Sequence, residues 1–594
     1  MASNIGIDFG STYSMLSYYD EENDVVNGIQ TENGSVYIPS VACMDEFGDL
    51  LLGQEARDEM RSDPTLTPYR AFKMLLHELN HEKVVRYGYQ EVKPEEVASR
   101  FLRKYLDIAA EHRQVQQFDS AVICVPEHWT SSCVSMSGRA VLLNLCTSFQ
   151  TENKAPLLKH IRVVTEPVAA TAYYAYNYRE QPFEGEVIVV DYGGGTLDVT
   201  LTSVTADREK NGVMEIDAIY RTGVGENHDD GQIGDAGLAY MEEVTKRALA
   251  AAGFANPKMD GNFLRVKDKL ESELMNGTRK ISDRIQQRYA LGMRRMRNDQ
   301  EVFTYAPYRK TRIDITYSML YTVFEELIQP KLEKCLGEIK DVLVKGGSDL
   351  NDSGSNIKLA IVGGFGQFPL VQKAVWEFFR CSDTAMDITL DARGGGQDAI
   401  SFGAALIAAG KVQVKITSKY SMGLMRTRKG KETFRYALRC GQGVDCSEIY
   451  PVCSNEDAQR GIKTWDSVIY TGSDDSENNP WIFAVNNDPQ NFEEAVLLVP
   501  QPHKRRELDE KLRNAAGLYR AEMKKQGYPY VNNNYFFGIS MNESDIYYLH
   551  VFPTHPGTGK RDEKPIVTVS LGDFPALFGP NVSLDAGTRI RYIE

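Results

Sequence analysis

The sequence predicts a mixed α/β protein whose chain contains an internal duplication. The segment "VIVVDYGGGTLDVTLTSV", residues 187–204, runs from an apolar, β-branched strand through three glycines into a second strand. The segment "NIGIDFGSTYSMLSYYD", residues 4–20, repeats the order of apolar strand, aspartate, aromatic residue, glycine and strand. A repeated pattern of this kind indicates two similar structural units in one chain.

The glycines interrupt a strand in both copies, which is a position that needs an explanation. Glycine weakens a strand interior, so it marks either a surface turn or a place where a ligand touches the backbone. A surface turn does not require aspartates at its edges, whereas Asp191 and Asp198 flank the triplet and Asp8 stands in the first copy. Free N–H groups of two facing hairpins suit a polyphosphate, and carboxylates suit hydrated magnesium. The hairpins therefore predict a polyphosphate site.

Two other phosphate-binding patterns fit the sequence less well. In a dinucleotide-binding fold the glycine turn opens a helix, but the β-branched and hydroxyl residues after Gly195 favour another strand. A Walker-type loop needs Gly-Lys followed by Ser or Thr, whereas "PGTGKRD" has Arg561 after Lys560 and no apolar strand before it. We interpret residues 556–562 as a loop.

Further motifs follow in a fixed order along the chain. They are "RAFKMLLHE" at 70–78, "FDSAVICVPEHW" at 118–129, "IRVVTEPVAATAYYAY" at 161–176 and "AIVGGFGQFPLVQKA" at 360–374. Together with the two hairpins, these motifs make the chain similar to the heat shock protein 70 family, within the actin-like ATPase superfamily. The resemblance covers residues 4–412 and fades beyond them.

The resemblance implies a two-lobed actin-like ATPase, in which duplicated ribonuclease-H-like lobes enclose a nucleotide. We expect the first lobe over residues 1–165 and the second over 166–412. A divergent C-terminal domain, β-rich or mixed α/β and partner-binding, is expected over 413–594. A prior of about 150 residues per compact unit gives about four units for this chain, most of them supplied by the lobes and their subdomains.

Local patterns predict individual helices and strands. "KPEEVASRFLRKYLDIAAEH", residues 93–112, starts with a proline and acidic residues, as helix N-termini do. Further helices are expected over 236–290 and 316–345, the second of them kinked at Pro330. In the C-terminal domain we expect one charged helix within residues 487–529 and strands over 533–540, 546–552 and 565–571.

Composition limits the partners of the protein. The net charge of −15 argues against nucleic acid or an anionic membrane as the main partner, because phosphate binding needs a basic surface. Hydrophobic residues make up 42% of the chain and charged residues 25%, as in ordinary globular proteins. No apolar run is long enough for a bilayer and no signal peptide is recognisable, so a cytoplasmic protein is expected. The nine cysteines have no CxxC or zinc-ligand spacing, which predicts reduced structural thiols.

By resemblance, each hairpin contributes half of a phosphate site. The β-phosphate half consists of Gly10, Ser11, Thr12 and Tyr13, and the γ-phosphate half of Gly193, Gly194, Gly195 and Thr196. Thr196 would also aim the attacking water. The implied cofactors are ATP or ADP and magnesium, with potassium as an additional candidate ion.

The reacting groups also follow from the resemblance. Asp8 and Asp191 would hold the magnesium shell, and Asp198 would accept a proton or bind an ion nearby. Lys73 would offset charge on the γ-phosphate; the alternative is a solvated lysine on a helix. Glu166 stands at a strand-to-helix junction, where it is either a further reacting group or a helix-capping acid.

The nucleoside end departs from the family pattern. The residues that fit the pattern there are Gly363, Gly364, Arg279 and Ser282. Phe365 and Gln367 replace the serine and arginine of the family, and Gln397 replaces an aspartate that precedes the last helix. Because arginine stacking on the base is partly lost, we expect Phe365 to stack in its place.

The coupling elements depart as well. Pro126 matches the switch proline of the family, but Val134 stands where an arginine is expected, and Arg139 lies five positions later. No leucine-rich acidic linker or peptide cleft is recognisable after residue 412. We expect a slow ATPase of the chaperone type, whose lobe closure controls a C-terminal domain that binds a protein client or partner. The alternatives are a filament-forming or scaffolding actin relative, and a small-molecule kinase of the same superfamily.

Overall fold

The computed structural model divides the chain into two compact units. The first unit consists of residues 1–129 and 141–414, and the second of residues 130–140 and 415–594. The structure describes residues 3–593 except 32, 64–65, 67–68, 71, 77–84, 88–89, 128, 130–137, 179–181, 208–212, 225–235, 255–262, 264–265, 268, 271–300, 309–310, 348–355, 380–395, 397, 419–420, 429–430, 440–441, 452–481, 487–495, 501, 532–534 and 573–589.

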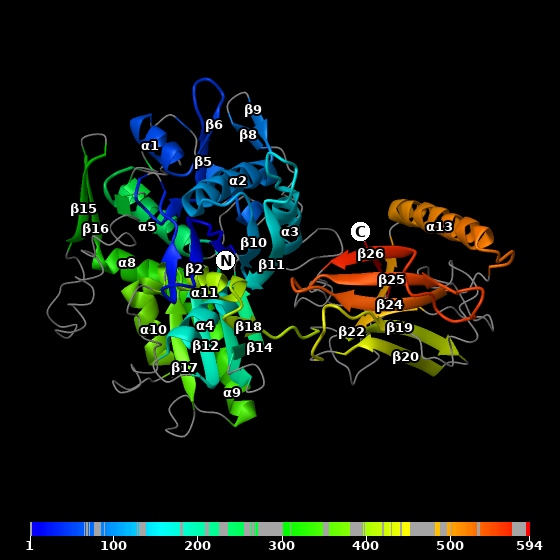
Figure 1. The fold of residues 1–594 in the computed structure, drawn as a ribbon. Helices are drawn as coiled ribbons and strands as arrows, with labels where there is room; N and C mark the ends of the chain where they lie inside the picture. The colour runs from blue at the N-terminus through cyan, green and yellow to red at the C-terminus, as the bar shows by residue number, and fades with distance from the viewer. Residues whose placement is uncertain are drawn as a thin grey trace. The chain divides into compact units, whose positions relative to one another are not determined.

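The first sheet of the first unit has the strand order β11-β10-β1-β2-β3, with β4 paired to β2 (Figure 1). These strands are β1 (Asn4–Asp8), β2 (Tyr13–Asp20), β3 (Val25–Gly28), β4 (Ile38–Pro39), β10 (Phe118–Val125) and β11 (Leu158–Thr165). Strand β1 has a parallel neighbour, β10, on one side and its hairpin partner, β2, on the other. Such a central strand is covered on both faces, which explains why its residues from Asn4 to Ile7 are all buried.

The second sheet repeats this arrangement in the order β17-β12-β13-β14-β18. Its strands are β12 (Gly185–Tyr192), β13 (Leu197–Asp207), β14 (Val213–Val224), β17 (Ile357–Val362) and β18 (Val412–Val414). Strand β12 again lies between a parallel neighbour, β17, and an antiparallel hairpin partner, β13. The topology therefore confirms the predicted duplication, with β1 and β12 in equivalent positions.

Two helices rich in small residues occupy the space between the sheets. Helices α4 (Glu166–Asn177) and α11 (Ala399–Ala408) pack against each other, and they share a buried core with residues of both sheets. At Gly403 a Cβ would lie 1.7 Å from the carbonyl oxygen of Ala169, so only glycine permits this approach. Gly6 on β1 also lies close to α11, where a Cβ would lie 2.4 Å from the nitrogen of Ala405.

The other helices of the first unit agree in part with the predictions. Helix α2 (Pro94–Arg113) confirms the helix expected from residue 93 onward. Helix α5 (Gly237–Ala251) accounts for the start of the expected 236–290 helix, and residues 271–300 lie outside the described part of the chain. The remaining elements are α1 (Gln54–Ser62), α3 (Gly138–Ser148), α10 (Pro369–Phe379), η1 (Met74–Leu76), η3 (Phe365–Gln367), β5 (Val41–Met44), β6 (Leu50–Leu52), β7 (Tyr69–Arg70), β8 (Val85–Tyr87), β9 (Gln90–Val92), β15 (Glu301–Tyr308) and β16 (Thr311–Thr316).

The expected kink at Pro330 takes the form of a change in helix type. Helix α8 (Tyr317–Val323) continues as a π-helical segment, η2 (Phe324–Ile328), and then as α9 (Gln329–Gly346). Proline lacks an N–H group and its ring collides with the carbonyl four residues earlier, so the turn before Pro330 cannot keep ordinary α-helical bonding. The wider π-turn accommodates the proline without ending the helix.

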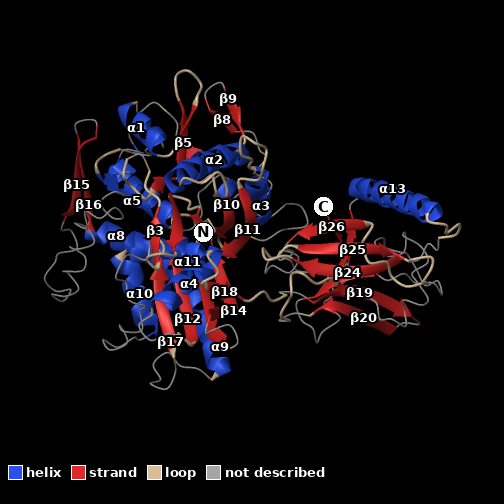
Figure 2. Cartoon of the chain, in the orientation of Figure 1, coloured by secondary structure: helices blue, strands red, loops and turns tan. Residues whose placement is uncertain are grey.

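Two sheets and the long helix α13 make up most of the described residues of the second unit (Figure 2). One sheet has the order β20-β19-β22-β23-β27 and the other β21-β24-β25-β26. Their strands are β19 (Ser421–Arg428), β20 (Lys431–Leu438), β21 (Tyr450–Pro451), β22 (Ile482–Asn486), β23 (Val496–Pro500), β24 (Tyr535–Met541), β25 (Tyr547–Pro553), β26 (Val567–Gly572) and β27 (Ile590–Ile593). Helix α13 (Pro502–Lys525) confirms the expected charged helix, and β24, β25 and β26 confirm the three expected strands. Residues 556–562 form the expected loop, closed by a bridge between Thr554 and Arg561.

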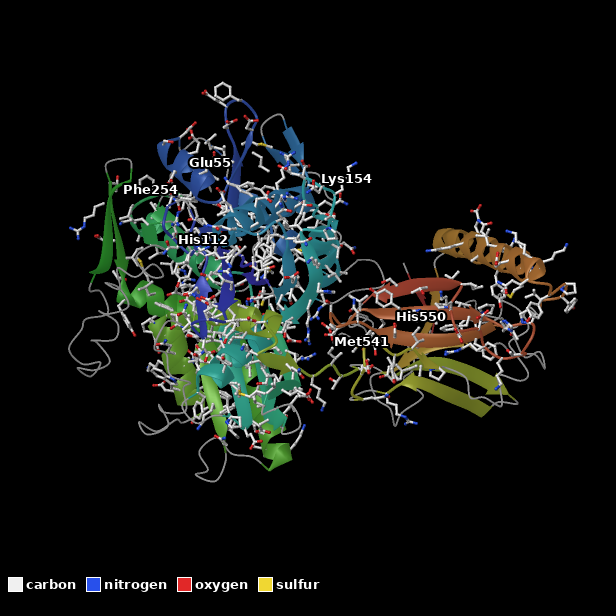
Figure 3. All side chains as sticks on the ribbon, viewed as in Figure 1. Glu55, His112, Lys154, Phe254, Met541 and His550 are labelled. Carbon is white, nitrogen blue, oxygen red and sulfur yellow. The ribbon has the colours of Figure 1, made fainter. Side chains whose placement is uncertain are left out.

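Residues of β24 and β25 contribute to the buried core of the second unit. Ile539 and Met541 on β24 are fully buried, as are Tyr547 and Val551 on β25. Figure 3 shows Met541 and His550 on these neighbouring strands. Burial along β25 is nearly continuous, as expected of a strand that is covered on both faces. Throughout the described ranges, every helix is too short or too polar to span a bilayer.

Candidate functional site

A cavity of about 840 Å³, its open mouth included, lies where both glycine hairpins turn. The lining residues are Asp8, Gly10, Ser11, Thr12, Tyr13, Ser14, Met15, Tyr37, Lys73, Glu166, Asp191, Gly193, Gly194, Gly195, Thr196, Gly363, Gly364 and Ile400. The structure therefore brings together almost all of the site residues that the sequence predicts and that lie in its described part.

The two hairpins face each other at very short range. A Cβ on Gly194 would lie 2.2 Å from Oγ1 of Thr12, and a Cβ on Gly195 would lie 2.7 Å from Oγ of Ser11. At these distances a side chain at either position would force the side chain of Thr12 or Ser11 to move. The backbones of the two turns therefore form the opposite walls of one cradle, as a polyphosphate site needs.

The charged groups of the cavity are mostly removed from solvent. Lys73 is 2% exposed and its Nζ lies 2.5 Å from Oε1 of Glu166. Asp191 is also buried, and Asp198 is fully buried opposite it in the β12–β13 register. With Asp8 at the end of β1, these carboxylates outnumber the one ammonium group among them.

This crowding shifts the pKa values of the cavity. Burial, with a further contribution from Glu166, raises the pKa of Asp8 to about 7, although Lys73 opposes the shift. Burial followed by the charge of Glu166 raises the pKa of Asp191 well above its usual value. For Lys73, burial alone would lower the pKa, but the neighbouring carboxylates outweigh it and raise the pKa. Lys73 therefore stays charged and the carboxylates favour a further cation.

The donor set fits a hydrated divalent cation. Oδ2 of Asp191 is buried and makes no hydrogen bond to any residue that the structure describes, a costly state for a carboxylate oxygen. In the same described residues, no three acidic, histidine or cysteine side chains converge closely enough to hold a metal ion directly. Magnesium keeps much of its water shell, so carboxylates such as Asp8 and Asp191 suit it through bridging waters.

The structure does not agree with a solvated lysine at position 73, whereas Glu166 does lie in the first turn of a helix. Lys73 opens the η1 turn and points into the cavity, so it is not a solvated lysine on a helix. Glu166 is the first residue of α4, and its carboxylate accepts a hydrogen bond from the Lys73 ammonium. The position at the helix start brings Glu166 to the cavity, where its partner is a charged side chain.

Phe365 requires a correction. It is fully buried in the core of the second sheet, with ring centroids of Tyr192, Tyr240 and Phe368 at 5.0, 5.1 and 5.6 Å, and it does not line the cavity. The expected stacking of Phe365 on a base is therefore not made. The reason is that an aromatic ring gains more from apolar burial among other rings than from a half-exposed cleft wall.

Other parts of the nucleoside end are placed as follows. Gly363 turns with a φ of +79°, and the side chain of Gln367 donates to the carbonyl of Ile361 at 3.0 Å. Arg279, Ser282 and Gln397 lie outside the described residues.

Sequence reasoning missed Tyr37 and Asp398. Tyr37 lines the cavity, and its phenol donates a hydrogen bond to the carboxylate of Asp398. Asp398 occupies the N-cap position of α11, yet its side chain makes no capping bond. The one available signal is that an aspartate directly precedes the α11 sequence, next to the noted Gln397.

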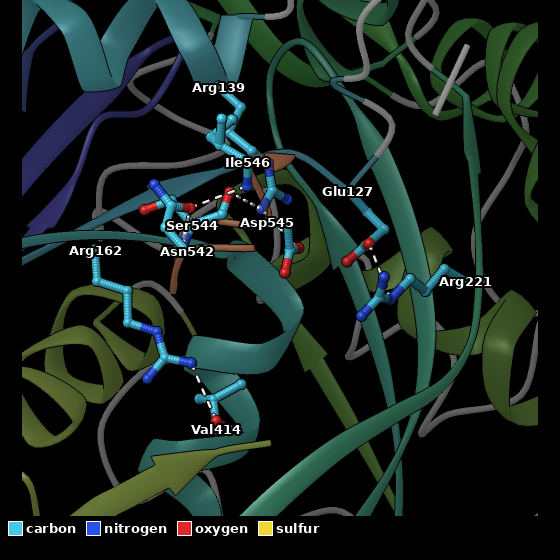
Figure 4. A network of polar contacts seen from close by, with 9 residues as sticks. All are labelled: Glu127, Arg139, Arg162, Arg221, Val414, Asn542, Ser544, Asp545 and Ile546. Atoms are coloured by element: carbon cyan, nitrogen blue, oxygen red, sulfur yellow. Dashed lines mark hydrogen bonds and ion pairs between the residues drawn. The ribbon is translucent and has the colours of Figure 1, made fainter. Parts of the chain in front are cut away.

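Figure 4 shows polar contacts around the coupling elements. Glu127, which directly follows Pro126, lies 3.0 Å from the Arg221 guanidinium on β14, so the pair joins the ends of the two sheets. Arg139 groups with the second unit and lies 2.9 Å from the carboxylate of Asp545. Val134 lies outside the described residues.

The paired sheets and the glycine-walled cavity between their hairpins define an actin-like ATPase fold. The chain belongs to the Hsp70 family, whose sequence model, described as "Hsp70 protein", matches residues 4–415. Among its relatives are the chaperone proteins DnaK of Thermotoga neapolitana and Thermotoga petrophila, each 26% identical over 378 residues. Each match covers 63% of this chain and 55% of the relative, so the chain spans about half the length of these relatives.

Proposed function

We propose that the first unit binds Mg-ATP in the cavity and hydrolyses it slowly, and that the protein acts in the manner of a chaperone. In this proposal, two lobes, residues 1–165 and 166–412, close on the nucleotide and thereby control partner binding by residues 413–594. The observation that carries the proposal is that both hairpins, Lys73 and the carboxylates converge on one cavity. Family membership and the chaperone relatives support it.

The roles of the residues follow from their positions. The backbone N–H groups of the first hairpin would hold the β-phosphate and those of the second the γ-phosphate. Magnesium, when bound, would neutralise phosphate charge through waters on Asp8 and Asp191. The Lys73 ammonium, already charged in the cavity, would stabilise the charge that develops on the transferred group. Thr196 lines the γ-phosphate wall and would orient the attacking water.

Asp198 would act through its hairpin partner. It is fully buried and does not line the cavity, but the register places it directly opposite Asp191. Burial first, then the charges of Glu166 and Asp198, raise the pKa of Asp191. Asp198 would therefore act on a cation at Asp191, or it would serve as the proton acceptor that the resemblance implies.

Calorimetry on a matched pair of glycine variants tests the proposal. Gly194→Ala places a methyl group 2.2 Å from Thr12, whereas Gly346→Ala on α9 meets no atom within 4 Å. We expect magnesium-dependent ATP binding in the wild type and an unchanged affinity in Gly346→Ala. Gly194→Ala should lose about tenfold or more in ATP affinity, because its methyl group occupies space that the phosphate needs. Absence of ATP and ADP binding in the wild type at millimolar concentration would refute the proposal.

A further inference from the structure

We propose that Trp129 is a positioning residue for Lys73. The indole face and the Glu166 carboxylate together fix the ammonium group at the edge of the cavity. The inference rests on the proposed function, because the importance of the ammonium position depends on the role of Lys73 in hydrolysis. Trp129 itself does not line the cavity, so it acts on the nucleotide only through Lys73.

Three separate segments converge at the ammonium. Lys73 lies in the turn before η1, Trp129 follows β10, and Glu166 begins α4. The Nζ of Lys73 lies 5.6 Å from the centroid of the Trp129 ring and 2.5 Å from Oε1 of Glu166. The ammonium therefore has an anion and an aromatic face as neighbours, at distances where both attract it.

The surroundings hold the indole rigidly. Trp129 is fully buried and belongs to the core cluster of the first sheet, together with Phe72 and Val125. Its backbone nitrogen donates to the carbonyl of Pro126 at 3.4 Å, which turns the chain back after β10. Tryptophan offers the strongest cation–π face of the aromatic residues, and the attraction is greatest where water is excluded, as it is here.

This arrangement addresses a weakness of lysine as a catalytic cation. Its four-carbon stem is flexible, so one contact with Glu166 leaves the ammonium able to swing around that carboxylate. The indole ring of Trp129 on a second side of the ammonium restricts this movement and keeps water away from the charge. A cation that is already in place needs no reorganisation when negative charge develops in the reaction, which is the main source of electrostatic catalysis.

The alternative is that Trp129 merely fills the core, and a double-mutant cycle separates the two roles. Single-turnover ATP hydrolysis is measured for Trp129→Phe and Trp129→Leu, each in the wild type and in Lys73→Ala. We expect Trp129→Leu to slow hydrolysis about tenfold in the wild type, with Trp129→Phe closer to normal and ATP affinity within about twofold throughout. In the Lys73→Ala background neither substitution should slow hydrolysis further. Equal slowing in both backgrounds would overturn the inference.

Tryptophan emission without nucleotide gives a second readout that needs no activity. Lys73→Met keeps the stem and removes the charge beside the indole, so it should shift the emission of the wild type but not of Trp129→Phe. An unchanged spectrum of Lys73→Met would overturn the inference, even if Trp129→Leu fails to fold. If the wild type does not hydrolyse ATP, the proposed function fails, and the emission shift alone decides whether Trp129 contacts the Lys73 cation.

Discussion

In the proposed function, hydrolysis depends most directly on Lys73. We expect Lys73→Ala to lower turnover about a hundredfold or more, equal to about 3 kcal/mol of barrier, because one preorganised electrostatic contact in a closed site has this value. ATP affinity should change little, since the charge is needed mainly in the transition state. Single-turnover hydrolysis and calorimetry measure the two effects.

The control for this substitution is the double variant Lys73→Ala with Glu166→Gln. Lys73→Ala alone leaves the buried Glu166 carboxylate without its 2.5 Å partner and therefore costs stability, whereas the double variant removes that uncompensated charge. Thermal melts of both variants show which part of the loss is structural. Normal hydrolysis in a folded Lys73→Ala protein would remove Lys73 from the mechanism.

Gly363 is a second residue whose identity follows from its surroundings. Its φ is +79°, close to the φ of +75° at Gly347, the residue that follows the last residue of α9. A Cβ on Gly363 would lie 2.6 Å from Oδ1 of Asp191 and from the carbonyl of Tyr192, whereas a Cβ on Gly347 meets no atom within 4 Å.

We expect Gly347→Ala to cost about 1 kcal/mol of stability, which is the price of a left-handed backbone with a side chain. Gly363→Ala should cost about 1–3 kcal/mol more, because the methyl group must also displace neighbouring atoms. It should also weaken Mg-ATP binding by moving Asp191. Urea denaturation and calorimetry of the two variants test this. Equal losses of stability in Gly347→Ala and Gly363→Ala would show that the close contacts around Gly363 add nothing to the cost of the substitution.

Among the elements, β25 connects its neighbours through a histidine. Nε2 of His550 lies 2.7 Å from Oγ of Ser540 on β24, and Nδ1 lies 2.9 Å from Oγ1 of Thr568 on β26. Burial lowers the pKa of His550 below its usual value, so the ring is neutral over a wider pH range in the folded chain than in the unfolded chain.

This pKa shift predicts acid sensitivity. The unfolded chain takes up a proton near its usual pKa of about 6.5, so the stabilisation is complete above that pH and is lost as the pH falls toward the lower folded pKa. We therefore expect the stability difference between wild type and His550→Gln to shrink as the pH falls from 7.5 to 5.5. Urea denaturation at several pH values measures it. His160→Gln, at an exposed position on β11, is the control, and a pH-independent difference for His550→Gln would contradict the prediction.

At the scale of the whole molecule, the ion pair of Glu127 and Arg221 joins the two sheets of the first unit. The Glu127 side chain is 5% exposed and the Arg221 side chain 27%. Breaking a fully buried pair by removing one partner costs about 3–5 kcal/mol, and the partial exposure of Arg221 reduces this to about 2 kcal/mol. Arg221→Gln should therefore destabilise the first unit by that amount and should speed nucleotide release, since one link between the two sides of the cleft is lost.

The double variant Glu127→Gln with Arg221→Gln provides the comparison. It breaks the same link and also removes the buried charge that Arg221 faces, so we expect it to be more stable than Arg221→Gln and equally fast in release. Urea denaturation and stopped-flow displacement of a fluorescent ADP analogue measure the two quantities. Release as slow as in the wild type would show that the pair stabilises the fold without restraining the cleft.

The sequence by itself determined those features that short segments encode. Both hairpins, their glycines and aspartates and Lys73 belong to local patterns, because turn geometry and strand periodicity act over a few neighbouring residues. Helix α2 and strands β24 and β25 were predictable for the same reason.

Only the tertiary structure decided which distant segments meet. The contacts of Tyr37 with Asp398 and of Trp129 with Lys73 join parts of the chain far apart in sequence, and no local pattern marks them. The direction of Phe365 was also undetermined, because a residue beside a glycine turn can face the cavity or the core. The packing of the second sheet decided that Phe365 faces the core. Apolar burial is non-directional, so it depends on the apolar surface that the whole fold offers to the ring.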